Sequence, residues 1–564
     1  MWRLLLVLLI LATLTAGAMN WSVRGDSAPA DFTFCGRGDH KTLDPGQMSW
    51  LQDIRAAYAL WEGLYTLDPV TLQPIPGTAD RVQIDPAKTV YTFHIRDSAR
   101  WTNGDPVRST DFLFAWRRII EQPGDYTFLH FYIKGAEQYA DKYADWVKQA
   151  DASPGLTNIP PPDYSIVGVK APDDRTLIVT LKNPTPFFLS LCAFPPFFPL
   201  HENSMRPFAV VDPHTGRASS YDEAFTRPPN LVSNGPYRLS LWQFKRKLRY
   251  VASDFYWDRT NVKSKIMDEP IIEDALARFR AYYDGQVDWL YEVEGSMIGE
   301  MREQGGWPDM HVFPSFGTYF YVLNCLPKLP DGRRNPMADP RVRQALAMSI
   351  DKQPIVDNVT RGGEQIASNY VPIKFFADYP SPPGQRYDIA KAQQLLAEAG
   401  YPNGRGFPPL SLLFNKETYH GDVALIVRSQ WKQNLGIDVD LSGVEIKVFG
   451  YRLHNRDFDI ARASWYGDYP DPSTFTDKFL SDNDDNNAGW SNPQYDALCA
   501  QAAREPDSQK RMKLLAQAEQ ILLDQAPVIP IFYYTNQYMF RSNVHGIPFD
   551  PLMRAMFQPI WVQR

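Results

Sequence analysis

A chain of 564 residues is too long to be organised around one hydrophobic core. Single cores stop growing at about 250–300 residues, and longer chains split into domains of about 50–200 residues. The length therefore predicts about two to four domains. Strand-like and helix-like stretches alternate along the whole sequence, so the fold class is expected to be α/β with a large mixed content.

Residues 90–96 and 110–120 show both patterns clearly. The first stretch alternates apolar and polar side chains, as a half-buried strand does. In the second, Thr110 is placed to N-cap a helix that follows a turn. The same patterns predict further strands at residues 31–35, 165–169, 176–181 and 528–534, and helices at 50–64, 339–350, 388–400, 423–435 and 509–524.

Residues 184–199 are rich in proline and aromatic side chains. Proline lacks the amide hydrogen that a sheet ladder needs, so this stretch is excluded from the interior of a sheet. We expect a packed crossover here, which is also a candidate domain boundary.

The N-terminus has the pattern of a secretory signal peptide. Arg3 gives a positive start, residues 4–14 form an apolar run, and residues 16–18 have the small-x-small form of a cleavage site. The run is shorter than the roughly 20 residues that span a bilayer. We therefore expect residues 1–18 to be a signal peptide and residues 19–30 a flexible leader; an uncleaved anchor and a misassigned start are the alternatives. No cysteine ends the run, so no lipoprotein site is evident, and a soluble periplasmic protein is expected.

Charge and cysteine content exclude several classes of function. The net charge of −7 argues against a nucleic-acid partner, because nucleic-acid-binding chains usually carry a basic surplus. Cys35, Cys192, Cys325 and Cys499 are far apart and form no CxxC pair, which leaves zinc and redox motifs unsupported. An exported protein permits disulfides, but isolated buried thiols are the preferred interpretation.

The common catalytic and metal-binding motifs are absent from the sequence. It holds no HExxH, no GxSxG, no GxxxxGK[ST] and no GxGxxG that opens a helix. The acidic run at residues 482–487 fails as a calcium loop, since Asn487 and Pro493 stand where glycine and glutamate are needed. We therefore expect no catalytic residue, no metal site and no cofactor, and predict that the protein is not an enzyme.

Seven short segments, in order along almost the whole mature chain, resemble the motifs of one family. They are TLDP at 42–45, LWEGL at 60–64, NGDPV at 103–107, SNGPY at 233–237, DPRVRQA at 339–345, AKAQQLLAEAG at 390–400 and GWSNPQYDAL at 489–498. Each motif is weak alone. Together they resemble the peptide-binding receptors of ABC importers, solute-binding protein family 5, and most closely its oligopeptide-binding branch.

The resemblance implies a periplasmic-binding-protein fold of type II, in which two α/β lobes close over a ligand like a Venus flytrap. An extra domain is inserted near the N-terminus. Carried onto this chain, the first lobe comprises residues 31–66, 201–314 and 541–564, the inserted domain residues 67–200, and the second lobe residues 315–540.

Asp468 is the residue that the sequence most clearly marks for a ligand. Phe458 and Ile460 fit a strand that ends near Trp465, and Asp468 follows in a turn rich in glycine and proline. A cleft that encloses a peptide must neutralise its α-ammonium, because a buried unpaired charge is very costly. In related receptors the acid of this motif pairs with the α-ammonium, and the resemblance implies that role for Asp468. The alternative is a turn acid that caps its own backbone.

The strand before Asp468 supplies three more expected ligand contacts. Arg462 stands where the family places a charge near the ligand carboxylate or backbone, and a guanidinium fork suits a carboxylate. An interdomain ion pair is an equal alternative for Arg462. Trp465 and Tyr466 are expected as walls of side-chain pockets, with simple core packing as the alternative.

Five site residues come from other parts of the chain. The resemblance implies that Tyr126 contacts the ligand, and that the backbone near Ser49 and Leu51 pairs with an extended ligand like an added strand. An acid is common in the family near the position of Ser49, so no side-chain role is implied for it. Tyr319 and Phe320 are expected on the hinge side of the cleft.

The far end of the ligand is where the sequence departs from the family. Leu453 and Ile446 occupy places where relatives carry an arginine and a tryptophan. Arg452 or Arg361 are candidates to replace the missing positive charge. The preferred peptide length therefore stays open.

The expected function is the capture of short peptides outside the cytoplasm and their delivery to an ABC-type permease with its ATPase subunits. We expect a monomer. One alternative is the same receptor fold with another ligand, such as a murein peptide, a metal chelate or haem. The other alternative is an enzyme, which the absence of catalytic motifs disfavours.

Overall fold

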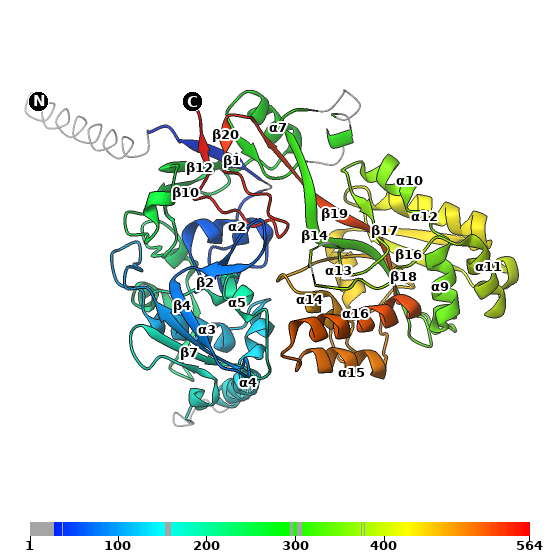
Figure 1. The fold of residues 1–564 in the computed structure, drawn as a ribbon, viewed down its shortest axis with the longest axis horizontal. Coiled ribbons are helices and arrows are strands. Elements are labelled where there is room, and N and C mark those ends of the chain that lie inside the picture. Colours follow the sequence, from blue (N-terminus) through cyan, green and yellow to red (C-terminus); the bar gives the residue numbers. More distant parts are fainter. Residues whose placement is uncertain are drawn as a thin grey trace, which may run out of the picture.

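The computed structural model describes residues 28–36, 38–152, 160–293, 297–299, 301, 307–373, 375–376 and 378–564. The predicted signal peptide, residues 1–18, and most of the predicted leader, residues 19–30, lie outside this part of the chain. Within it, no helix combines the length and the apolar composition that crossing a membrane requires. The molecule has two sides joined by a pair of long strands (Figure 1).

One 11-stranded sheet extends through both sides of the molecule. Its order is β10-β11-β12-β1-β13-β19-β14-β18-β16-β17, with β15 paired to β19. Its strands are β1 (Phe32–Cys35), β10 (Tyr237–Gln243), β11 (Lys247–Ala252), β12 (Ile266–Pro270), β13 (Trp289–Leu290), β14 (Met310–Leu323), β15 (Gln365–Ile366), β16 (Leu410–Asn415), β17 (Val439–Val444), β18 (Ile460–Tyr466) and β19 (Val528–Phe540). We call the part around β10, β11, β12, β1 and β13 the first lobe, and the part around β18, β16 and β17 the second lobe.

The long strands β14 and β19 belong to both lobes. They pair antiparallel, and their register shifts between Pro314 and Thr318 and again between Tyr319 and Phe320. On one side of the first shift β19 pairs with β13 of the first lobe, and on the other β14 pairs with β18 of the second lobe. A register shift interrupts the ladder and bends the strand, so the lobes are joined at a built-in bend.

The second lobe has helices on both faces of its sheet. Alternate residues of β14 point to opposite faces, so Tyr319, Tyr321 and Leu323 enter one apolar core while Phe320 and Val322 enter another. The first core includes side chains from α9 (Pro340–Met348), α11 (Ile389–Glu398) and α12 (His420–Leu435), and the second from α13 (Ile446–His454), α14 (Ser473–Thr476), α15 (Pro493–Ala502) and α16 (Ser508–Gln525). Burial on both faces explains why the second half of β14, residues 319–323, is a continuous apolar and aromatic run.

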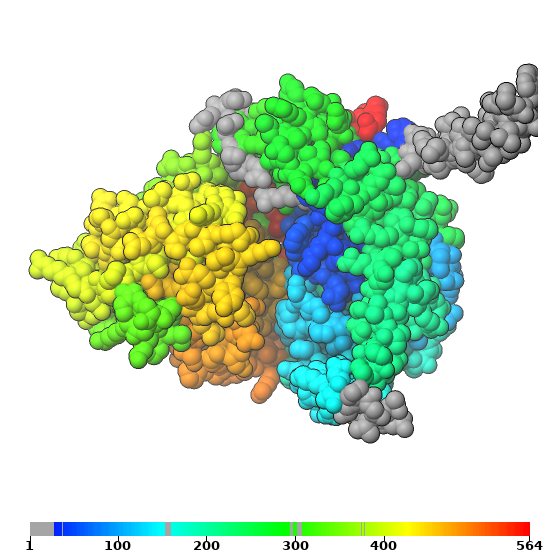
Figure 2. Space-filling view, turned by 180° about the vertical axis from the view of Figure 1, so that it is seen from behind, coloured from blue at the N-terminus to red at the C-terminus, as the bar shows by residue number. Residues whose placement is uncertain are grey.

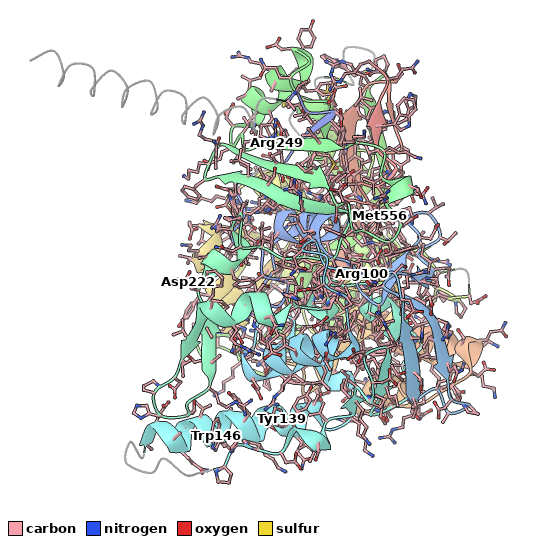
Figure 3. All side chains as sticks on the ribbon, turned by 90° about the vertical axis from the view of Figure 1, so that its left-hand side faces the viewer. Arg100, Tyr139, Trp146, Asp222, Arg249 and Met556 are labelled. Carbon is pink, nitrogen blue, oxygen red and sulfur yellow. The ribbon has the colours of Figure 1, made fainter. Side chains whose placement is uncertain are left out.

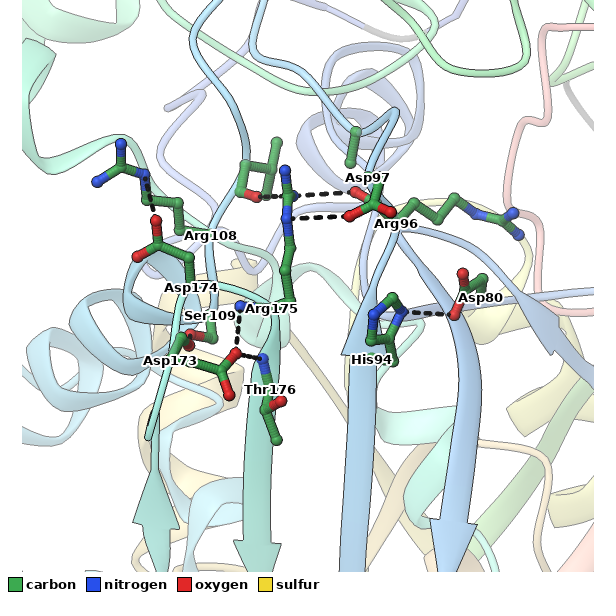
Figure 4. Close-up of polar contacts among 12 residues, drawn as sticks. Asp80, His94, Arg96, Asp97, Arg108, Ser109, Asp173, Asp174, Arg175 and Thr176 are labelled. Carbon is green, nitrogen blue, oxygen red and sulfur yellow. Dashed lines mark hydrogen bonds and ion pairs between the residues drawn. The ribbon is translucent and has the colours of Figure 1, made fainter.

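A separate four-stranded sheet lies beside the first lobe. Its order is β4 (Ala79–Ile84), β5 (Val90–Ile95), β7 (Thr176–Thr180) and β6 (Val169–Lys170). The helices α3 (Ser109–Glu121) and α4 (Ala136–Ala152) pack with it in one core, and Tyr139 and Trp146 of α4 are both buried (Figure 3). At the strand ends, Asp173 accepts the N–H groups of Arg175 and Thr176, both at 2.8 Å (Figure 4).

The first lobe is assembled from pieces that are far apart in the sequence. β1 lies parallel between β12 and β13. The ring of Phe34 in β1 lies 4.7 Å from that of Phe557, and Arg564 Nη2 donates to the carbonyl of Asp31 across a separation of 533 residues. The core around the first strand therefore needs the last part of the chain.

The remaining helices and strands are short or lie at the edges of these layers. They are α2 (Leu51–Leu60), β2 (Tyr65–Leu67), β3 (Pro74–Pro76), α5 (Phe188–Leu191), α6 (Glu202–Met205), β8 (Ala209–Val211), β9 (Ala218–Tyr221), α7 (Ala275–Tyr283), α10 (Gln353–Ile355), β20 (Val544–His545) and β21 (Trp561–Val562).

Most predicted elements are confirmed. Residues 31–35, 90–96, 176–181 and 528–534 correspond to β1, β5, β7 and β19, and residues 339–350, 388–400, 423–435 and 509–524 to α9, α11, α12 and α16. The crossover predicted at residues 184–199 contains only short helical turns, and Phe188 and Phe197 within it are fully buried. All four cysteines are free thiols, as preferred, and Cys325 alone among them is half-buried rather than buried.

Three predictions about element limits are wrong. The strand at residues 165–169 is instead a 3₁₀ turn, because Asp163 accepts the N–H of Ser165 (2.9 Å), and β6 starts only at Val169.

The helix at residues 50–64 ends at Leu60, since Trp61 is extended and Glu62 donates its N–H to Asn234 Oδ1 (3.1 Å). The N-cap of α3 is Arg108 rather than Thr110, because the Asp111 carboxylate accepts the Arg108 N–H (2.8 Å).

The N-cap of α9 supplies a test of local stability. Asp339 accepts the N–H of Arg341 (2.9 Å) and pairs with its guanidinium. We expect Asp339→Ala to destabilise the first turn of α9 by about 1 kcal/mol, since the helix loses its side-chain cap. Hydrogen exchange of α9 amides, followed by mass spectrometry, should become about fivefold faster. Asp339→Asn keeps a capping oxygen and should lose less, and equal acceleration in both variants would contradict the capping role.

Candidate ligand-binding site

The turn after β18 carries Asp468 into the space between the lobes. Gly467 donates its N–H to the carbonyl of Phe316 (2.9 Å). A Cβ at Gly467 would lie 2.0 Å from a ring atom of Phe316, so only glycine permits this approach. The Asp468 N–H donates to Thr474 Oγ1 (3.2 Å) at the start of α14. The backbone of this turn is therefore held from both sides.

Asp468 lines a cavity of about 110 Å³ together with Leu51, Tyr126 and Tyr466. Figure 2 shows the seam between the two sides, with blue and cyan segments facing yellow and orange ones. Leu51 comes from α2, Tyr126 from the chain between α3 and α4, and Tyr466 from the end of β18. The structure thus brings four of the predicted site residues to one cavity.

The Asp468 carboxylate is a desolvated acid. Surrounding protein raises its pKa to about 7, chiefly through burial and further through Asp485, while Lys478 and Thr474 act in the opposite direction. Within the described chain the carboxylate forms no ion pair, although the side chain keeps partial exposure to the cavity. Such a group gains most from a cation that enters the cavity, because the cation compensates for the lost solvation.

Lys478 lowers the pKa of Asp468, but its ammonium is bound to other groups. Its ammonium donates to the carbonyl of Asp485 (2.8 Å) and lies 4.5 Å from the ring centre of Trp465. The indole of Trp465 in turn donates to the carbonyl of Thr474 (2.7 Å). Trp465 therefore does not line the cavity. It packs beside the cavity, where it contacts the turn and Lys478.

A second polar cluster surrounds Arg462 on β18. Its guanidinium lies 5.3 Å from the ring centre of Tyr319, and Nη2 donates to the hydroxyl of Tyr534 (3.4 Å). The Tyr319 hydroxyl interacts with Arg462 and Tyr321, whereas among the described residues Arg462 Nε and His420 Nδ1 lack hydrogen-bond partners. Burial, reinforced by Arg462, lowers the pKa of His420 to about 3. The cluster is thus a largely buried cationic site lined by tyrosine hydroxyls and His420.

β18 and the turn that follows it carry both Arg462 and Asp468. Side chains at alternate positions of a strand share a face, so Arg462 and Tyr466 lie on the same side of β18. Tyr466 stacks on Tyr534 with ring centres 4.7 Å apart, and Tyr534 is also the partner of Arg462.

The other predicted residues lie apart from the cavity. Phe320 is 1% exposed and packs against Tyr370 (ring centres 5.1 Å apart) in the core of the second lobe. Ser49 is half-buried just before α2. The candidate Arg452 pairs with Asp457 (3.0 Å). Arg361 donates to the carbonyl of Gly299 (3.3 Å).

Tyr469, next to Asp468, bridges the two sides of the cleft. Its ring stacks on Phe187 with centres 4.3 Å apart, and its hydroxyl lies 3.3 Å from that of Tyr132. The guanidinium of Arg511 lies over the same Phe187 ring and is paired with Asp471 (2.6 Å). The turn that carries Asp468 is therefore part of the contact that closes the cleft.

Sequence reasoning missed several residues of this region. His420 and Tyr534 join the Arg462 cluster from α12 and β19, and Arg554 reaches the cavity from the C-terminal segment. No local motif marks them, since only the tertiary fold brings them to β18.

Comparisons with known proteins agree with this architecture. The family model of the bacterial extracellular solute-binding proteins, family 5 Middle, matches residues 73–487. The oligopeptide-binding protein OppA of Bacillus subtilis (strain 168) is 32% identical over 488 residues, which cover 84% of this chain and 82% of that protein.

Solved structures show the same fold. The Escherichia coli murein tripeptide binding protein MppA superposes with a TM-score of 0.74 at 29% identity, covering 94% of this chain and 98% of that chain. The Haemophilus influenzae OppA complex with RPPGFSPFR superposes with a TM-score of 0.73 at 26% identity, covering 94% and 98% of the two chains. The expected two-lobed α/β fold of periplasmic binding proteins is confirmed, and the chain belongs to the bacterial extracellular solute-binding proteins, family 5.

Proposed function

We propose that this protein is a peptide receptor of the periplasm that captures short peptides and delivers them to an ABC-type permease with its ATPase subunits. The observation that carries the proposal is the Asp468 carboxylate, desolvated and without an ion pair in the described chain, at a cavity between two lobes. A peptide α-ammonium is the cation that such a site fits. Relatives named for oligopeptide binding support the same ligand class.

The fold suits capture and release rather than catalysis. The lobes meet at the bend in β14 and β19, and Tyr469 joins the two walls of the cleft. A ligand held by both walls favours the closed form, because it interacts better with that form than with the open one. We propose that the protein is not an enzyme, acts as a monomer, and comprises two lobes and an inserted domain with the limits expected above.

The Arg462 cluster is proposed as the site of the peptide carboxylate. Four residue steps of about 3.3 Å, or roughly 13 Å, lead along β18 from Arg462 to Tyr466, which lines the same cavity as Asp468. An extended peptide of about four residues spans the same length. His420 and the tyrosine hydroxyls around Arg462 add donors for a carboxylate or for bridging water.

The first prediction concerns Asp468→Asn. Removing one charge of a buried ion pair typically costs about 2–5 kcal/mol, so the Kd for tri- to pentapeptides should rise by about 30-fold or more. Isothermal titration calorimetry measures the change, and mass spectrometry of recovered ligand should show intact peptide. Asp482→Asn, at an exposed position of a nearby loop, is the matched control and should bind normally.

N-acetylated peptides complete this test. They lack the α-ammonium and should bind the wild-type protein weakly. Their affinity for Asp468→Asn should be no lower than their affinity for wild type. Absence of binding for every free peptide by wild type, or cleavage of the bound peptide, would overturn the proposed function.

Peptide affinity is expected to depend on pH through Asp468. Its pKa of about 7 in the unliganded protein means that the carboxyl is mostly protonated below pH 7, and the α-ammonium binds the ionised form. Affinity should therefore weaken by about fivefold from pH 7 to pH 6 and approach about tenfold for each further pH unit. Calorimetry between pH 5.5 and 7.5 in buffers of different ionisation enthalpy should detect the released proton. Asp468→Asn should show a flat profile; a similar slope in that variant would assign the effect to another group.

Another prediction concerns the C-terminal carboxylate of the peptide and Arg462. Amidating the C-terminus of a tetrapeptide removes its charge and should weaken binding to wild type about tenfold, through loss of a charge-assisted hydrogen bond. The penalty should largely vanish in Arg462→Gln. Arg452→Gln is the matched control, since Arg452 is already paired with Asp457 and should leave the penalty unchanged. An undiminished penalty in Arg462→Gln would move the carboxylate site elsewhere.

A further inference from the structure

Beside the Asp468 carboxylate, the wall of the cavity is apolar. Ile54 comes from α2, Leu67 from β2, and Ala193 and Phe194 from the chain that follows α5. Ile54, Leu67 and Ala193 are 7%, 2% and 2% exposed, so this wall is shielded from bulk water. An apolar surface next to a site for a cation has no use in binding the cation itself. It is complementary to an apolar group on the same ligand.

Among the described residues that line the cavity, Asp468 and Arg554 are the charged ones. Arg554 is already neutralised, because its Nη2 lies 2.7 Å from Asp550 Oδ2 and the two residues are 5% and 0% exposed. Once Asp468 is paired with a ligand, a second charged group in the cavity would be desolvated without compensation. Arg554 Nε, which has no partner in the described chain, is the competing polar feature.

Covalent geometry connects the ammonium site to this wall. The α-ammonium and the first side chain of a peptide share one Cα atom, so an ammonium held at Asp468 places the first side chain within the same cavity. The cavity measures about 110 Å³. An apolar protein cavity of about 150 Å³ accommodates benzene, so this one suits a branched aliphatic group better than an indole.

We propose that the receptor selects peptides whose first residue is leucine, isoleucine or valine. This inference rests on the proposed function and adds the chemical class of its ligand. Burying such a side chain removes apolar surface from water, which corresponds to about ten- to hundredfold in affinity relative to glycine. Peptides with a charged first residue bind more weakly than peptides that begin with glycine, because the described wall of the cavity holds no unpaired opposite charge for that side chain.

The test is calorimetry with tetrapeptides X-Ala-Ala-Ala, where X is Leu, Val, Gly, Trp, Lys, Asp or Glu. The expected order is Leu and Val tightest, Gly about ten- to hundredfold weaker than Leu, and Lys and Asp weaker than Gly. Equal affinities across the series would overturn the inference and leave the proposed function intact. Tightest binding for Glu would overturn it in favour of Arg554 as the determinant. Binding of no peptide at all would instead reject the proposed function.

Two variants change the volume of the pocket in opposite directions. Ala193→Met fills it, so the advantage of Leu over Gly should fall below threefold while the Gly-first peptide still binds. Leu67→Ala enlarges it, so the affinity ratio of Trp-first to Leu-first peptides should rise at least fivefold. Ala503→Met, at an exposed position beyond α15, is the control and should leave every ratio unchanged. If the ratio of Trp-first to Leu-first affinity is unaltered in Leu67→Ala, the first side chain lies outside this pocket. This outcome is decisive even if Ala193→Met does not fold.

Discussion

The antiparallel pairing of β14 with β19 is the interaction on which the arrangement of the lobes depends. These strands carry one sheet from the first lobe to the second, and their register shift falls between the segments that pair with each lobe. A continuous ladder resists shear, whereas the interrupted segment from Pro314 to Thr318 can bend. Phe316 lies within this segment and accepts the N–H of Gly467, so the bend is connected to the turn that carries Asp468.

The site combines a strand, a turn and a contact across the cleft. β18 aligns Arg462 with Tyr466, the turn presents Asp468, and Tyr469 fixes the same turn against Phe187 on the opposite wall. Movement of one wall relative to the other therefore acts directly on the acid. Under the proposed function, Asp468 pairs with the ligand while its neighbour Tyr469 contacts the opposite wall, so binding of the ligand is coupled to closure of the cleft.

Local sequence patterns predicted most elements because those patterns are themselves the cause of the structure. Asp339 caps α9 through its own side chain, and the alternation of residues 90–96 matches the pleat of β5. Predictions failed at limits that a single hydrogen bond decides: the distant Asn234 accepts the N–H of Glu62 just after the helix ends at Leu60, whereas Asp163 and Asp111 act on residues close to them in the sequence. The same limit applies to the site: Asp468 is marked by its turn and the family resemblance, whereas His420 and Arg554 reach the region only through the tertiary fold.

The distance in sequence between Asp31 and Arg564 also constrains how the protein is made. Their contact spans 533 residues, and Phe34 packs against Phe557 in the same core. At about 5–20 residues per second, synthesis separates the two segments by roughly half a minute to two minutes. The strands that pair with β1, β12 and β13, are made about halfway through synthesis, whereas the Phe557 ring that packs on Phe34 is added only near the end, so the core of the first lobe is completed late.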